Sequence, residues 1–245
     1  MNSEILLPAF LAGILVLSTH VPFGQEVLKR GIIFIDLTLA QMAGLGLIIA
    51  HSFNWETHGW EEQLIATIAA LSGATLLAWS EKQFPKNQEA LIGSLFVITA
   101  SMGIVLLANN PHGGEHLKDL LVGQILWVET RHLWATALLY GFILGTWFYL
   151  PLKWRLQSFY FLFALTITAS VQLVGVYLVF ASLIMPALAT NHLKWGYLVG
   201  IVGYAAGLVI AHLFDLPAGA VIVLMLALVS LCGRMLYSFR KHLVI

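Results

Sequence analysis

Apolar runs of about 20 residues recur along the whole chain, and this feature constrains the fold more than any other. Crossing about 30 Å of hydrocarbon takes roughly 20 helical residues. Lipid offers no partner to a backbone N–H or C=O group, so only helices and closed barrels can span it. A barrel would show segments of about 10 residues with alternating polarity, and runs such as Ala218–Leu231 show none. The sequence therefore predicts an all-α, polytopic transmembrane helix bundle.

The composition supports a membrane protein and excludes several other classes. Hydrophobic residues make up 60% of the 245 residues, and charged residues only 10%, whereas a soluble domain carries about 25% charged residues. The net charge of zero gives no reason to expect nucleic acid as a partner, and the one cysteine excludes an internal disulfide. The chain lacks a Walker A pattern, so we expect no ATP site of its own and no enzyme activity. Glu4 stands where a signal peptide would carry basic residues, so the first apolar run is predicted to be a retained span.

Polar interruptions divide the chain into about eight or nine spans within a single transmembrane domain, residues 1–245. The connections are short and leave no room for a soluble domain. A long apolar stretch near residue 174 is divided only by Val174-Gly175, which makes that boundary the weakest. The nine predicted spans cover residues 4–21, 31–53, 63–80, 90–108, 132–152, 156–174, 175–190, 196–213 and 218–233.

The distribution of cations predicts the orientation, because cytoplasmic connections of membrane proteins are rich in Lys and Arg. With the N-terminus outside and the C-terminus in the cytoplasm, ten of the twelve Lys and Arg residues fall on the inner side. Only Lys118 and Arg131 fall outside. A wrong span count would scramble this bias. We therefore expect a multi-pass membrane protein with this orientation.

Acidic and histidine residues gather toward the predicted outer side, where they would attract a divalent cation. The His112–His116 loop holds two imidazoles and a carboxylate within five residues, and zinc accepts such ligands. A solvated loop or a docking surface fits the same residues, and acidic residues also collect outside simply because cations fill the inner connections. The candidate outer metal contacts are His51, His58, His112, Glu115 and His116.

Asp36 is the sharpest single residue, because it interrupts an apolar span. A carboxylate inside a membrane is costly unless it is paired or hydrated. Thr38 and Gln41 interrupt the same span, and their spacing places them on one helix face while Asp36 borders it. We expect Asp36, Thr38 and Gln41 to line or gate a cation path. A structural hydrogen bond near the inner end of the helix is the alternative.

Other patterns point to packing rather than chemistry. Glycines recur in the spans, and Gly203–Gly207 forms a GxxxG pattern of the kind that lets membrane helices approach closely. HExxH and GxSxG motifs are absent from the sequence, as is a pair of aspartates within the spans. Nothing in the sequence argues for an intramembrane enzyme.

Four segments, in this order, resemble the zinc, manganese and iron ABC transporter permeases of the ABC-3 family. The first joins Pro22-Phe23-Gly24, Lys29-Arg30-Gly31, Asp36 and the run from Leu39 to Gly46. The others are Leu121–Val128, with a Gly-x-Ile/Leu-Leu core, then Leu173–Thr190, and Asp215–Ala220. Their spacing covers nearly the whole chain.

The resemblance implies a type II importer-like permease that works as a homodimer, with the ion path at its two-fold axis. It also implies cytoplasmic ABC ATPase subunits, a periplasmic or lipid-anchored metal-binding protein, and transport of a divalent ion with no permanently bound cofactor. The stretch Pro186–Lys194 resembles the family's coupling helix, and the cation count places it on the cytoplasmic side. The candidate coupling residues are Pro186, Ala187, Thr190, Asn191, His192 and Lys194.

The sequence departs from the family pattern in two places. The family commonly has a histidine where this chain has Gln41, an amide that coordinates zinc far less well, and the aspartate is shifted by one residue. The predicted inner connection Lys153-Trp154-Arg155 is also shorter than usual, which would reduce the surface for an ATPase.

The ion is therefore open: zinc comes first because of the outer histidines, and manganese and iron follow. An iron-chelate ABC permease is one alternative, although such chains are usually longer. A secondary transporter is another, although it would often show matched half-repeats, and an intramembrane enzyme is a third.

Overall fold

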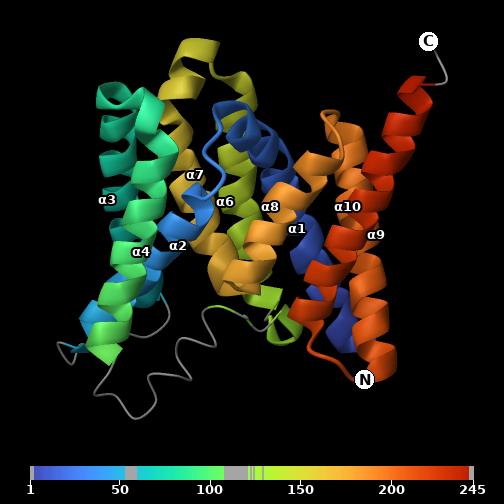
Figure 1. Cartoon of the computed structure of the whole chain (residues 1–245). Coiled ribbons are helices and arrows are strands. Elements are labelled where there is room, and N and C mark those ends of the chain that lie inside the picture. The colour runs from blue at the N-terminus through green and yellow to red at the C-terminus, as the bar shows by residue number, and fades with distance from the viewer. Residues whose placement is uncertain are drawn as a thin grey trace. The chain divides into compact units, whose positions relative to one another are not determined.

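The computed structural model is all-helical (Figure 1). It describes residues 3–52, 60–107, 121, 123, 125–128 and 130–242, without the side chains of 3–5, 51, 52, 130 and 236–242. Within these residues the α-helices are α1 (Ser3–Arg30), α2 (Ile35–Ser52), α3 (Trp60–Gln83), α4 (Gln88–Leu107), α6 (Thr130–Tyr149), α7 (Leu152–Val174), α8 (Val176–Ala189), α9 (Leu193–Phe214) and α10 (Ala218–His242). Two 3-10 turns, η1 (Pro85–Asn87) and η2 (Ile125–Trp127), complete the described elements.

The all-α class and the approximate number of spans are confirmed. In the described part of the chain, six helical segments are long and apolar enough to cross a membrane: Leu6–Arg30, Trp60–Gln83, Pro85–Leu107, Leu152–Val174, Leu193–Phe214 and Ala218–Met235. The apolar parts of α2 and α8 are shorter. Helix α8, with 14 residues, is about 21 Å long at 1.5 Å per residue, so it is shorter than the hydrocarbon layer.

Several helix boundaries differ from the prediction by one turn or more. Helix α1 runs to Arg30 rather than ending near residue 21, and its Pro22 lies inside the helix. The carboxylate of Glu26 forms an ion pair with Arg30, one turn further along, at 3.0 Å. This ion pair stabilises the last turn of α1. The residues predicted as the inner connection, Lys153–Arg155, instead form the first turn of α7, whose Arg155 N–H bonds to the Pro151 carbonyl.

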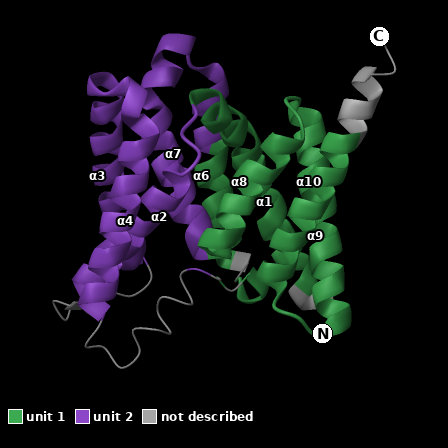
Figure 2. Cartoon of the chain, viewed as in Figure 1, with its two compact units in different colours: residues 1–30, 122–141, 173–245 green, residues 31–121, 142–172 purple. Residues whose placement is uncertain are grey.

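The chain forms two compact units (Figure 2). Unit 1 contains residues 1–30, 122–141 and 173–245, and unit 2 contains residues 31–121 and 142–172. Unit 1 therefore holds α1, α8, α9, α10 and η2, and unit 2 holds α2, α3, α4 and most of α7, while α6 contributes to both. That residues 1–245 act as a single transmembrane domain stays a prediction.

Glycines bring the helices of unit 1 close together. Helix α9 places Gly196 and Gly200 against Val21 and Leu17 of α1, and its GxxxG pair Gly203 and Gly207 against Leu226 and Ile222 of α10. A Cβ at any of these four glycines would overlap the facing residue. The order of the pairs shows that α9 runs antiparallel to both neighbours. The close helix packing predicted from the small residues is thus present on two sides of α9.

In unit 2, helices α2 and α4 lie side by side and run in the same direction. The Phe34 N–H donates to Glu89 Oε1 at 3.4 Å, the Thr38 hydroxyl donates to the Ile92 carbonyl at 3.0 Å, and Gly103 faces Ile48. All three pairs are separated by 54 or 55 residues in the sequence. Helix α3 returns the chain between them and packs on α2 through Gly46 and Gly73. The first turns of α2 and α4 therefore lie at the same end of unit 2.

A glycine break separates α7 from α8 inside unit 1. Gly175 has φ 81° and ψ 162°, a backbone conformation that is essentially restricted to glycine. Gly123, with φ 65°, approaches so closely that a Cβ there would overlap the backbone of Val174 and Gly175. The predicted division near Val174-Gly175 is confirmed, and the segment that carries the Gly-x-Ile/Leu-Leu core packs against it.

This contact makes Gly123 indispensable for folding of unit 1. We expect Gly123→Ala to lower the yield of folded protein in detergent and its unfolding temperature, because the new Cβ meets backbone atoms that cannot move away and the positive φ adds about 1–3 kcal/mol of strain. Fluorescence-detected size exclusion and thermal unfolding measure both effects. Gly141→Ala is the matched control, since a Cβ there meets no atom within 4 Å. Equal behaviour of the two variants would contradict this packing.

Candidate functional site

Asp36 lies in the first turn of α2 and is 1% exposed. Neither of its carboxylate oxygens has a hydrogen-bond partner among the described residues. The N-terminal end of a helix favours a negative charge by about 0.3–1 kcal/mol, and by up to about 2 kcal/mol in a partly buried site. Taking a carboxylate out of water costs several kcal/mol. The helix end alone therefore leaves the charge of Asp36 undercompensated.

Glu89 in the first turn of α4 is a second carboxylate of the same region, and sequence analysis missed it. Its Oε1 accepts the Phe34 N–H at the turn that begins α2, while its Oε2 is buried without a hydrogen-bond partner in the described structure. Because Phe34 lies two residues before Asp36, this bond brings Glu89 to the same turn as Asp36. The predicted span begins at residue 90, whereas α4 begins at Gln88 and includes Glu89 in its first turn. The position of Glu89 beside the start of α2 depends on the pairing of α2 with α4.

Thr38 is fully buried and holds α2 against α4. Its hydroxyl lies 3.1 Å from the Phe34 carbonyl, one turn back on its own helix, and 3.0 Å from the Ile92 carbonyl of α4. These bonds satisfy the hydroxyl group and give Thr38 a structural role. Its predicted place on a cation path stays a prediction.

Gln41 lies one turn further along α2 and lines a small pocket of unit 2. Because Thr38 bonds to α4 and Gln41 shares a pocket with α4, the predicted common face of these two residues is confirmed, and it is the face toward α4. Asp36 does not belong to the pocket lining. The pocket is formed by Ala40, Gln41, Gly44, Leu45, Ile48, Thr99, Ala100, Gly103 and Leu121.

The candidate outer metal contacts mostly fall outside the described residues. His58, His112, Glu115 and His116 belong to segments that the structure does not describe, and His51 is on the last turn of α2 without a described side chain. Within the described ranges, no group of three or more His, Cys, Asp or Glu residues is placed to hold a metal ion. The outer site therefore stays a prediction.

The candidate coupling residues divide into a buried set and an exposed set. Pro186, Ala187 and Thr190 are buried, and Ala187 faces Gly24 of α1. The Thr190 hydroxyl accepts the His192 N–H at 3.1 Å and closes a short turn between α8 and α9. The exposed residues at this turn are Leu188, Asn191, His192, Lys194 and Trp195. Only this second set offers its side chains to a partner.

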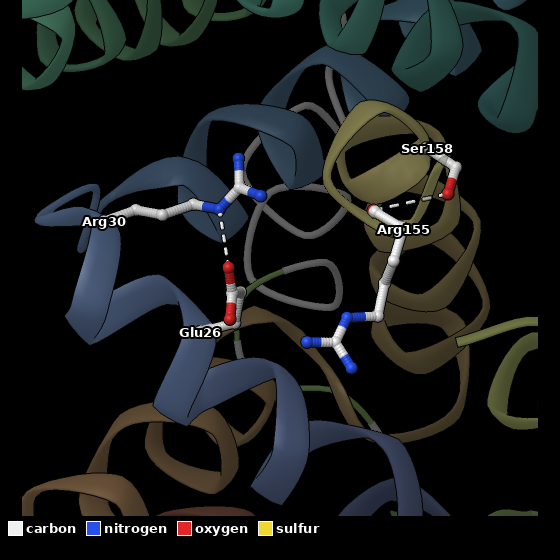
Figure 3. Close-up of polar contacts among 4 residues, drawn as sticks. All are labelled: Glu26, Arg30, Arg155 and Ser158. Carbon is white, nitrogen blue, oxygen red and sulfur yellow. Dashed lines mark hydrogen bonds and ion pairs between the residues drawn. The ribbon is translucent and has the colours of Figure 1, made fainter. Parts of the chain in front are cut away.

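Cations lie beside the coupling turn in unit 1 and at the start of α7 in unit 2. In unit 1, the Arg234 guanidinium donates to the Leu188 carbonyl at 3.3 Å, which places α10 beside the coupling turn, and the Glu26–Arg30 ion pair ends α1 (Figure 3). In unit 2, the Arg155 guanidinium lies 5.1 Å from the centre of the Trp147 ring. The Arg155 carbonyl accepts the Ser158 hydroxyl at 3.4 Å in the first turns of α7 (Figure 3).

A buried polar network fixes the first turn of α4 to α3 and α7 within unit 2. The Gln88 amide donates to the Leu77 carbonyl at 3.0 Å and to the Tyr160 hydroxyl at 3.2 Å, and its oxygen accepts from Ser80 at 3.0 Å. A fully satisfied network of this kind is rigid. Glu89, the next residue, is therefore presented from a fixed position.

Two of the relatives that this chain resembles have names that state a metal. The manganese transport system membrane protein MntC of Halalkalibacterium halodurans is 26% identical, over 88% of this chain and 82% of that protein. The high-affinity zinc uptake system membrane protein ZnuB of Haemophilus influenzae is 22% identical, over 90% of this chain and 93% of that protein.

A solved structure of PsaBC from Streptococcus pneumoniae in complex with Fab has the same fold, with a TM-score of 0.70 and 20% identity over 95% of this chain and 91% of that one. A model of the ABC 3 transport family matches residues 2–156 and 150–237 of this chain. Together these two matches extend over nearly all of the sequence. The chain is a member of the ABC 3 transport family.

Proposed function

We propose that this chain is the membrane-spanning subunit of an ATP-driven importer of a divalent metal ion. One observation carries the proposal beyond family membership: a buried carboxylate, Asp36, stands at the start of an apolar helix with both oxygens unpartnered among the described residues. Ionisable residues inside membrane segments mark ion pathways far more often than they serve packing. The family's permeases carry no ATP site, so separate ATPase subunits would supply the energy.

The metal is zinc or manganese, the two ions in the names of the relatives MntC and ZnuB. Zinc comes first in the sequence analysis because of the outer histidines. The described part of α2 offers oxygen donors instead, the carboxylate of Asp36 and the amide of Gln41, and oxygen donors suit manganese. Iron, or an iron chelate carried by a related permease, is the second candidate.

The orientation we propose places the coupling turn in the cytoplasm and the N-terminus outside, in a bacterial inner membrane. In unit 1, Lys29, Arg30, Lys194 and Arg234 lie at the end that holds the coupling turn. In unit 2, Lys82 is in the last turn of α3 and Lys86 is within η1, and the Gln88–Tyr160 bond places the first half of α7, which begins next to Lys153, against the start of α4. Cations gathered at one end of each unit support a cytoplasmic location of that end.

The proposed assembly is a homodimer with two cytoplasmic ATPases and a metal-binding protein on the outer side. ATP binding and hydrolysis would switch the permease between outward-open and inward-open states, with Asp36 and Gln41 along the path. A secondary transporter or an intramembrane enzyme is the alternative, and metal uptake that persists without an ATPase would favour the secondary transporter.

The role of Asp36 can be tested by a change that keeps its shape and removes its charge. We expect Asp36→Asn to reduce metal uptake by at least tenfold while the protein still inserts and assembles, because a cation on the path loses its nearest buried anion. Uptake is measured at equal membrane abundance. Asp215→Asn is the control: it makes the same change at a residue with a left-handed backbone conformation at the end of α9. Unchanged uptake by Asp36→Asn would remove Asp36 from the path.

The coupling turn can be tested through its exposed residues, which leave the fold intact. We expect the pair Asn191→Ala and Lys194→Glu to weaken ATPase co-purification and to abolish uptake, because their side chains face the solvent at the proposed cytoplasmic end. Arg131→Ala, an exposed cation at the start of α6, should leave both unchanged. If the pair variant retains its ATPase and its uptake, the turn is not the coupling element.

The proposed function is tested directly by uptake into proteoliposomes that contain this chain, its ATPase and its binding protein. We expect radioactive zinc or manganese to accumulate only when ATP and all three proteins are present, and not with an ATPase variant that binds but does not hydrolyse ATP. Competition between the two ions then ranks them. An assembled complex that accumulates neither ion would refute the function.

A further inference from the structure

The first turns of α2 and α4 bring two carboxylates together in unit 2, and the fold leaves most of their oxygens unused. Both oxygens of Asp36 and Oε2 of Glu89 are buried without a hydrogen-bond partner among the described residues. Asp36 is 1% exposed, and Glu89 Oε1 bonds to the N–H of Phe34, two residues before Asp36 in the chain. The backbone N–H groups at the start of α2, among them the Phe34 N–H bonded to Glu89 Oε1, compensate two neighbouring carboxylates only in part, so a positive charge shared between them would be favourable.

Helix-end stabilisation does not account for the pair. Each carboxylate lies in the first turn of its helix, where the helix dipole contributes at most about 2 kcal/mol. A single exposed carboxylate, such as that of Glu61 in the first turn of α3, would stabilise a helix end equally well. Asp36 is instead buried, and Glu89, which is half-buried, has its Oε2 atom buried without a described partner, so this arrangement needs a further cause.

Glu89 is positioned to work with Asp36 rather than to compete with it. Its Oε1 is held by the Phe34 N–H, so that Oε2 is the oxygen left for another partner. The adjacent Gln88 anchors the same turn to α3 and α7 through three hydrogen bonds. The pair is thus preorganised by backbone and network contacts, and the ordering cost on binding is small.

We propose that Asp36 and Glu89 form a two-carboxylate site for a hard divalent cation, which the transported ion occupies in transit. The available donors are carboxylate oxygens, and these suit manganese, magnesium and calcium. This inference rests on the proposed function for the identity of the occupant, although binding itself is testable without transport. Nothing in the sequence pattern assigned Glu89 to the path.

Two protein ligands suit a transit site better than a storage site. The described residues offer no third His, Cys, Asp or Glu around the pair, so water completes the coordination of a bound ion. An ion that must leave again requires a site that is favourable to enter and weak enough to release it. A rigid pair of oxygen anions meets both requirements.

The test uses the complete permease–ATPase complex in lipid nanodiscs without nucleotide, and Mn²⁺ as the probe. Equilibrium dialysis gives the affinity, and electron paramagnetic resonance of Mn²⁺ reports whether its ligands are oxygens. We expect Glu89→Gln and Asp36→Asn each to weaken Mn²⁺ binding at least tenfold. The double variant should be little weaker than either single one, because the two residues serve one ion.

Glu89→Gln keeps an oxygen acceptor for the Phe34 N–H and removes only the charge, so the unfolding temperature of the complex should not fall. Glu61→Gln is the matched control, with the same change in the first turn of α3, and it should bind Mn²⁺ as the unaltered complex does. Full Mn²⁺ affinity in Glu89→Gln, or no Mn²⁺ binding by the unaltered complex, would overturn the proposed site. A drop in unfolding temperature with unchanged affinity would show a purely structural carboxylate.

The same preparation separates this inference from the proposed function. Metal uptake by the unaltered complex, together with Mn²⁺ binding that ignores Glu89, would leave the importer in place and reject the site. Mn²⁺ binding that depends on both carboxylates, without any ATP-dependent uptake, would support the site and reject the importer.

Discussion

Every backbone polar group in the hydrocarbon layer must find its partner within the protein, and the rest of the structure depends on this constraint. This requirement makes the chain helical throughout its apolar runs. A helix can break within the membrane only where other residues of the protein cover the break. The break at Gly175 is covered in this way, because Val174, Gly175 and Val176 are all buried. Gly123 packs directly on the backbone of Val174 and Gly175 and helps to cover this break.

The lipid environment also explains the close packing of the helices, because lipid supplies no hydrophobic force to drive one helix onto another. Glycines therefore set the contacts. In unit 1, α9 uses one glycine pair toward α1 and another toward α10, while the Ser182 and Tyr204 hydroxyls bond at 2.7 Å between α8 and α9. In unit 2, Gly46 and Gly73 do the same for α2 and α3. Each unit is thus held by shape complementarity and a few buried hydrogen bonds.

Hydropathy was sufficient to predict the helical class, nearly all of the elements and the break at Val174-Gly175, because these depend on local composition. Helix ends were less predictable. Helix α1 continues through Pro22 to Arg30 with the help of a side-chain ion pair, which an apolar window cannot detect. Of the candidate site, Asp36 was found because a charge interrupts a span. Glu89 was missed because it comes close to the start of α2 only through the parallel packing of α4 on α2.

The parallel pairing of α2 and α4 also has a mechanical consequence. Two hydrogen bonds join the helices, from the Phe34 N–H to Glu89 and from the Thr38 hydroxyl to the Ile92 carbonyl. The two bonds lie one helical turn apart. Sliding one helix by a single residue, about 1.5 Å, would break both at once, and rotation about either axis would do the same. We therefore expect α2 and α4 to move together as a rigid pair. A displacement of η1, which leads directly into α4, would therefore also move the Gln41 pocket that α2 and α4 line.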